Sequence, residues 1–135
     1  MIQILYVYSD TAILILRLTL AFILLAHGWP KIRDLKTNAQ NFDGMGFRPG
    51  RFWGTAVAVA EFVGGLFLLA GMFTQIAALI LAIEFIVIVL WRIRGKQKLV
   101  SGYELDLVIL GALLILATTG SSLYALDTSF SVFFF

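Results

Sequence analysis

The sequence predicts an all-α integral membrane protein, a four-helix bundle in a single domain covering residues 1–135. Two observations indicate this fold. Of the 135 residues, 61% are hydrophobic and only 13% are charged, whereas soluble domains are roughly 45–50% apolar and about 25% charged. The apolar fraction amounts to about 82 residues, close to the roughly 80 that four spanning helices of about 20 residues each require. These proportions exclude a soluble globular protein and a disordered chain.

Four apolar runs are each long enough to cross a bilayer, and they place the spans at residues 11–29, 52–72, 74–91 and 103–121. The first 16 residues contain no Lys or Arg, so we do not expect a cleaved secretory signal. All basic residues except Arg17 fall in the loops between spans 1 and 2 and between spans 3 and 4. Because basic loops are retained in the cytoplasm, we expect both termini on the extracytoplasmic side of the cell membrane.

The loop between spans 1 and 2 shows a helical period. Its apolar residues recur at steps of three and four: Ile32, Leu35, Ala39, Phe42 and Met45. This spacing predicts an amphipathic helix lying on the cytoplasmic membrane surface, with a solvated basic loop as the alternative. The Gly- and Pro-rich residues 44–50 then turn the chain into span 2.

Span 2 contains a row of small residues, Ala56, Ala60 and Gly64, with Gly65 beside it. Such rows let helix backbones approach closely in lipid. We therefore expect spans 2 and 3 to pack as a close antiparallel hairpin, joined by the short turn at residues 72–74. The same row could instead form contacts between copies of the chain.

Three charged residues lie deep in the predicted spans: Arg17, Glu61 and Glu84. Such residues normally pair, line a polar cavity or titrate, because a charge at the bilayer centre is costly. Counted from the turn at Phe73, the two glutamates lie at the same depth, roughly 17 Å from the turn at 1.5 Å per residue. Two carboxylates at one depth cannot both stay charged cheaply. Either one of the two glutamates holds a proton or a cation lies between them, and Arg17 is the expected cation. A buried ion pair that only fixes helix register is the alternative to a functional site.

A second polar group is expected near the cytoplasmic ends of spans 1 and 4. His27 and Lys31 share one face of span 1, while Glu104 and Asp106 open span 4. His27 with either carboxylate could relay protons or hydrogen-bond a quinone carbonyl. Helix capping by Glu104 and a structural role for His27 are the alternatives.

With no cysteine and one histidine, the chain lacks ligands for a thiolate zinc site, an iron–sulfur cluster or a bis-His haem. We predict no metal, haem or iron–sulfur centre in this chain. Any electron donor must come from a partner membrane or peripheral subunit, or from the substrate itself. A homo-oligomer is a further expectation, and no nucleic-acid partner is expected.

The chain resembles the DoxX family of small four-helix membrane proteins over nearly its whole length. The resemblance rests on scattered small and polar positions: Arg17-Leu18, His27-Gly28 with Lys31, Ala60-Glu61 with Gly64-Gly65, Leu68-Leu69, Gly71, Thr74 with Ala77-Ala78, and Gly120 with Leu126-Asp127. It implies a likeness to the membrane subunit of thiosulfate:quinone oxidoreductase. The functional positions that it implies are Arg17, His27, Lys31, Glu61 and Asp127.

Taken together, these inferences give a quinone-linked oxidoreductase subunit as the leading hypothesis, with quinone as its cofactor. The residues assigned catalytic roles are Glu61, Glu84 and His27; those assigned to binding quinone or a small anion are Arg17, Lys31, Asp106 and Asp127. A small proton-coupled transporter and a non-catalytic assembly subunit are the alternatives. Whether the chain is itself an enzyme stays open at this point, because family membership does not fix a reaction.

Overall fold

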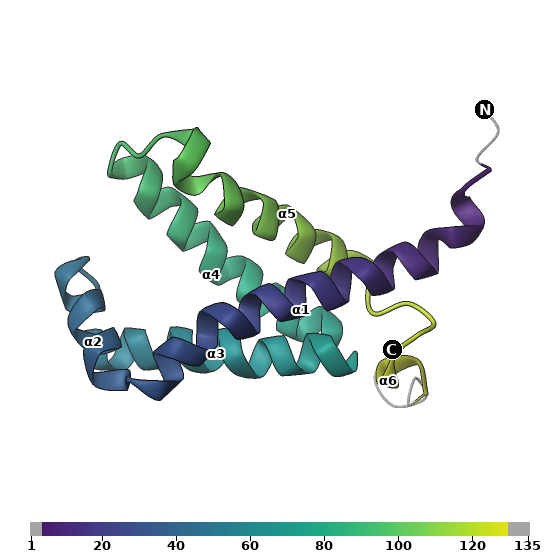
Figure 1. Ribbon diagram of the computed structural model, residues 1–135, viewed down its shortest axis with the longest axis horizontal. Coiled ribbons are helices and arrows are strands. Elements are labelled where there is room, and N and C mark those ends of the chain that lie inside the picture. The colour runs from purple at the N-terminus through teal and green to yellow at the C-terminus, as the bar shows by residue number, and fades with distance from the viewer. Residues whose placement is uncertain (1–3, 130–135) are drawn as a thin grey trace.

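The computed structural model describes residues 4–129, and every regular element in that range is helical (Figure 1). Short helical turns at Tyr6–Tyr8 and Leu99–Tyr103 precede the first and the last long helix. The helices are α1 (Ser9–Arg33), α2 (Leu35–Gly44), α3 (Gly50–Ala70), α4 (Thr74–Arg94), α5 (Glu104–Thr119) and α6 (Leu126–Ser129).

Four segments are long and apolar enough to span a membrane: α1 and α5 with their preceding turns, α3 and α4. The predicted all-helical fold with four spans is confirmed. The placement of the termini outside the cell, the membrane-surface location of α2 and the single domain stay predictions.

Helix α1 is longer than the predicted span, because Pro30 does not end it. The helix continues to Arg33, and Asp34 then leaves the helical conformation. A proline inside a helix removes one backbone hydrogen bond. Here the remaining turn still forms, and the adjacent Lys31 is therefore held in a rigid element rather than in a loop.

The helices pack mainly as two pairs, α1 with α3 and α4 with α5, and α2 packs against α3 (Figure 1). The contact between α3 and α4 is less extensive, so the predicted close hairpin of these two spans is only partly correct. Glycines mark the close approaches. A Cβ atom at Gly28 of α1 would lie 2.8 Å from the backbone nitrogen of Phe62, and one at Gly65 would lie 3.0 Å from Leu25 Cγ. Within α3, Gly65 thus lets α1 come close, whereas Gly64 faces Leu81 of α4.

A single apolar core joins the four spanning helices. Its fully buried members include Leu24 of α1, Leu68 of α3, Leu81 of α4, and Leu113 and Leu116 of α5. Most other large apolar side chains of these helices are exposed on the outer surface, as expected where lipid replaces water.

Helix α2 forms where the amphipathic period predicts a helix, and a buried polar contact attaches it to α3. Asn38 is buried, and its side-chain nitrogen donates to the carbonyl oxygen of Gly54 at 2.7 Å. Asp34 caps the helix by accepting from the backbone N–H of Thr37. Trp91, at the end of α4, donates from its indole nitrogen to the carbonyl of Met45. The loop after α2 is therefore fixed to both neighbouring spans.

Candidate functional site

A buried ion pair joins α1 to α3 in the interior of the bundle. The Lys31 ammonium lies 2.8 Å from each carboxylate oxygen of Glu61. The Glu61 side chain is only 2% exposed, whereas that of Lys31 is 28% exposed. The glutamate is almost fully removed from solvent, and Lys31 is the cation paired with it.

The third member of the site is Glu84 of α4. It is close enough to Glu61 and Lys31 to interact with both electrostatically. Both of its carboxylate oxygens are buried, and their hydrogen-bonding neighbour is the carboxyl group of Glu61. We refer to Lys31, Glu61 and Glu84 together as the interior triad.

The α3–α4 turn explains why the two glutamates meet. A Cβ atom at Gly64 would lie 2.8 Å from Leu81 Cδ1 across the hairpin. Moving three residues along each helix in opposite directions leads to Glu61 and Glu84, because antiparallel helices keep matched positions at the same height. The short turn thus fixes the register that places both carboxyl groups at one level.

Arg17 does not join this group, so its predicted placement beside the two glutamates is wrong. Its guanidinium donates instead to the carbonyl oxygens of Ser121 and Tyr124, both at 2.7 Å. The physical reason is the register between α1 and α3: Gly28 lies opposite Phe62 and Leu25 opposite Gly65. Continuing that pairing puts Arg17 opposite the turn at residues 71–74, about one half of the helix away from Glu61.

Asp127, predicted to bind substrate, occupies the same end of the bundle. Its carboxylate accepts from the backbone N–H groups of Phe73, at 2.6 Å, and Thr74, at 2.9 Å. Its own N–H donates to the carbonyl of Gly71 at 2.8 Å. Asp127 therefore caps the N-terminus of α4, where a carboxylate is favoured by the free amides and the helix dipole. Together with Arg17 it fastens residues 121–127 to the bundle.

The second predicted polar group does not assemble either. His27 is exposed and makes no hydrogen bond or ion pair in the described part of the chain. Asp106 Oδ2 lies 2.8 Å from Arg92 Nε, and Glu104 accepts from the backbone N–H of Ser101. The two carboxylates expected near His27 therefore contact other groups, and Lys31 contacts Glu61. The capping alternative for Glu104 matches the observed contact.

The charges of the interior triad balance when one of its carboxyl groups carries a proton. With both carboxyl groups ionised, the three side chains would carry a net negative charge inside an apolar bundle, which is costly. A proton on Glu84 makes the group neutral. Within residues 4–129 no cluster of three His, Asp or Glu side chains could hold a metal ion. The catalytic and binding roles assigned from the sequence stay predictions.

Sequence reasoning missed Lys31 as the cation of the triad. The available signal was Gly28: a close helix contact at that position orients Lys31, three residues later, toward the same neighbour. The pairing of Arg92 with Asp106 was missed because it depends on how the α4–α5 loop folds back, which no periodic pattern records.

Comparison with known proteins agrees with the resemblance to the DoxX family. The family model described as DoxX matches residues 12–93. "Putative oxidoreductase CatD" of Bacillus subtilis (strain 168) is 28% identical over 114 residues, covering 84% of this chain and 83% of that protein. "Inner membrane protein YqjF" of Escherichia coli (strain K12) is 31% identical over 121 residues, covering 88% of this chain and 92% of that protein. No solved structure matches the chain significantly.

Proposed function

The chain belongs to the DoxX family of membrane proteins, and on that premise we propose that it is the membrane subunit of an oxidoreductase that reduces quinone. The interior triad supplies the proton path in this proposal. The observation that carries it is Glu84, a carboxyl group whose oxygens are buried in the bundle beside the ion-paired carboxylate of Glu61.

The triad has the layout of a short proton relay. Lys31 is partly exposed, Glu61 is 2% exposed, and Glu84 follows on the next helix. Protons could thus enter at the ammonium end and reach Glu84 through Glu61. Intramembrane acidic residues arranged in this way are typical of proton pathways.

The position of Glu84 on α4 suits a lipid-soluble substrate. Leu81 and Ile88 lie on its interior side, while Ile80 and Val87 lie on its outer side and are exposed. Glu84 is therefore at the edge between the core and the lipid-facing surface. A quinone dissolved in the bilayer would reach this edge of α4 sideways, without passing through the bundle.

Reducing a quinone to a quinol consumes two electrons and two protons. The triad would deliver the protons to the quinone oxygens, with Glu84 as the immediate donor. The electrons would come from a partner subunit, or directly from an oxidisable anion such as thiosulfate. The description of one similar protein as an oxidoreductase supports this class of reaction.

The test uses membranes that contain the full chain with the proteins encoded beside it. Quinol formation is followed spectroscopically with a water-soluble quinone and either thiosulfate or the native donor. Removing a positioned proton donor typically costs 10²–10⁴-fold in rate. We expect Glu84→Gln to lower the rate of quinol formation by about 100-fold. Glu104 is an exposed carboxylate at the start of α5, and we expect Glu104→Gln to leave that rate unchanged.

Two results would overturn the proposal. One is a wild-type chain that forms no quinol with its cognate partners present. The other is a Glu84→Gln variant that matches the wild type. Proton-coupled solute flux into vesicles that depends on Glu84, without quinol formation, would assign the chain to transport instead.

A further inference from the structure

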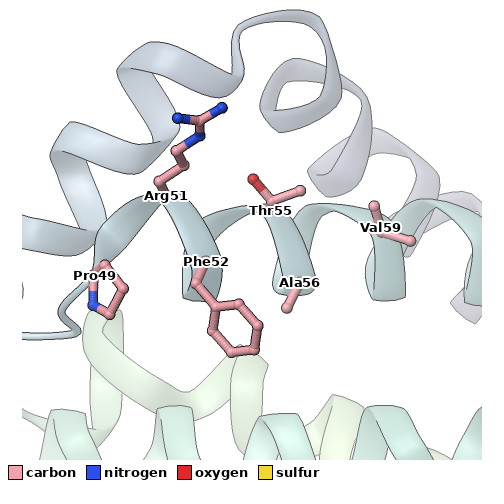
Figure 2. Close-up of a pocket in the computed structure, with 6 residues that line it drawn as sticks. All are labelled: Pro49, Arg51, Phe52, Thr55, Ala56 and Val59. Carbon is pink, nitrogen blue, oxygen red and sulfur yellow. The ribbon is translucent and has the colours of Figure 1, made fainter.

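An apolar pocket lies on the outside of α3, away from the interior triad (Figure 2). It has a volume of about 630 Å³ and is lined by Pro49, Arg51, Phe52, Thr55, Ala56 and Val59. Glu61 follows Phe52 by nine residues, which is about two and a half helical turns. The pocket and the triad therefore occupy opposite faces of the same helix, so this pocket does not serve the proposed proton path.

The walls of the pocket fit a hydrocarbon chain. Phe52, Ala56 and Val59 recur at steps of four and three, forming an apolar strip along α3, and all three are exposed. An exposed apolar strip on a spanning helix faces lipid. The strip runs along the helix axis, which is also the direction of an acyl chain in the bilayer.

The mouth of the pocket fits a phosphate. Figure 2 shows Arg51 and Thr55 projecting from one side of α3 and Phe52 and Ala56 from the other, and all four line the pocket. Within residues 4–129 the Arg51 guanidinium has no hydrogen bond or ion pair, and the Thr55 hydroxyl has no hydrogen-bond partner. A guanidinium binds phosphate oxygens through paired N–H donors. The N-terminus of α3 is already capped by the carboxylate of Asp43, which accepts from the Gly50 N–H at 2.7 Å, so the anion-binding group of this pocket is the Arg51 guanidinium.

We propose that this pocket binds one anionic glycerophospholipid, with its phosphate on Arg51 and an acyl chain along Phe52, Ala56 and Val59. No acidic side chain lines the pocket, so nothing there compensates the cation of a zwitterionic headgroup. The depth of the pocket agrees with this ligand, because Arg51 is at the end of a spanning helix, where lipid phosphates lie.

Native mass spectrometry of the full chain in mild detergent tests the proposal by titration with phosphatidylglycerol and with phosphatidylcholine of the same acyl chains. We expect phosphatidylglycerol to bind about tenfold more tightly to the wild type. Arg51→Gln is expected to abolish that preference. Arg94→Gln, which removes another exposed cation, from the end of α4, is expected to keep it.

A second variant tests the hydrocarbon part of the site. Ala56→Trp fills the pocket without touching the core, because Ala56 is exposed, and we expect it to weaken binding of phosphatidylglycerol severalfold. Equal affinity for the two lipids in the wild type would overturn the proposal, as would equal losses in Arg51→Gln and Arg94→Gln. Displacement of the lipid by inorganic phosphate at millimolar concentration would also contradict it, because the acyl chain is part of the ligand.

Discussion

The Lys31 ammonium holds both carboxylate oxygens of Glu61 at 2.8 Å, across the contact between α1 and α3. This contact satisfies a glutamate that is nearly inaccessible to solvent. The ion pair also lies close enough to Glu84 of α4 to interact with it electrostatically. Three helices therefore meet at one charged group, which makes this group both a structural joint and the candidate proton site.

The first prediction concerns the cost of removing the cation. Lys31→Met leaves Glu61 buried without a partner, and breaking a buried pair in this way typically costs about 3–5 kcal/mol. We expect the lower end of that range, about 3 kcal/mol, because Lys31 is partly exposed. The measurement is the free energy of unfolding in detergent micelles by denaturant titration.

Two further variants make this prediction specific. Lys31→Met combined with Glu61→Gln is expected to recover most of the lost stability, since no unpaired charge remains. Lys36→Met removes an exposed cation from α2 and is expected to change the free energy of unfolding by less than about 0.5 kcal/mol. Equal effects of Lys31→Met and Lys36→Met would contradict the assignment of the ion pair.

The second prediction concerns the close approach at Gly28. A Cβ atom there would lie 2.8 Å from the backbone nitrogen of Phe62, so Gly28→Ala must push α1 away from α3. Overpacking of this kind costs about 1–3 kcal/mol. Gly111→Ala is the matched control, because a Cβ atom at Gly111 would meet nothing within 4 Å. Thermal unfolding in detergent should show a lower midpoint temperature for Gly28→Ala and an unchanged or higher one for Gly111→Ala.

Sequence reasoning predicted the spanning helices and the common depth of the glutamates for physical reasons that are local. Long apolar runs specify spans, and the short turn between α3 and α4 lets the depth of Glu61 and Glu84 be counted from one reference point. No such reference exists between α1 and α3, because α2 and its loops separate them. The register of that pair depends on the fit of Gly28 and Gly65 against the facing helix, which residue counting does not reveal.

The same reasoning accounts for the error over Arg17. The predicted span 1 ends at residue 29, but α1 continues through Pro30 to Arg33, so Arg17 lies farther from the C-terminal end of its helix than the predicted span implies. A long side chain can also reach along the helix to an interface. The actual partners of Arg17 are backbone carbonyls of residues 121 and 124, and an irregular segment offers no sequence pattern that would identify them.

The third prediction is a pH effect outside the membrane spans. Hydrogen bonds from the Thr37 hydroxyl and backbone N–H hold the pKa of Asp34 below its ordinary value of 3.8. The cap on α2 is thus fully formed above pH 3.8 and is lost as the pH falls through the lowered pKa of the folded protein. Carboxyl NMR titration should show this shift, and Thr37→Val should move the pKa of Asp34 back toward 3.8. A pKa unchanged by Thr37→Val would contradict the role of the hydroxyl.

The fourth prediction concerns the cap that Asp127 places on α4. Asp127→Ala removes the acceptor for the N–H groups of Phe73 and Thr74, and loss of an N-terminal cap costs about 0.5–2 kcal/mol. Since about 1.4 kcal/mol corresponds to a factor of ten, we expect amide hydrogen exchange at Thr74 to accelerate by about 2- to 30-fold. Asp127→Asn keeps one acceptor oxygen and should give a smaller acceleration.

Arg17→Gln tests the other attachment of the same segment. The glutamine side chain is too short to reach both carbonyls that Arg17 contacts at 2.7 Å, so exchange in residues 121–127 should accelerate in this variant. Because Asp127 also holds this segment, Arg17→Gln and Asp127→Ala are expected to be non-additive when combined. The Lys31–Glu61 pair lies far along α1 from Arg17, so quinol formation should survive in Arg17→Gln if the proton path is correct. Loss of quinol formation with an unchanged exchange pattern would instead assign Arg17 to the substrate.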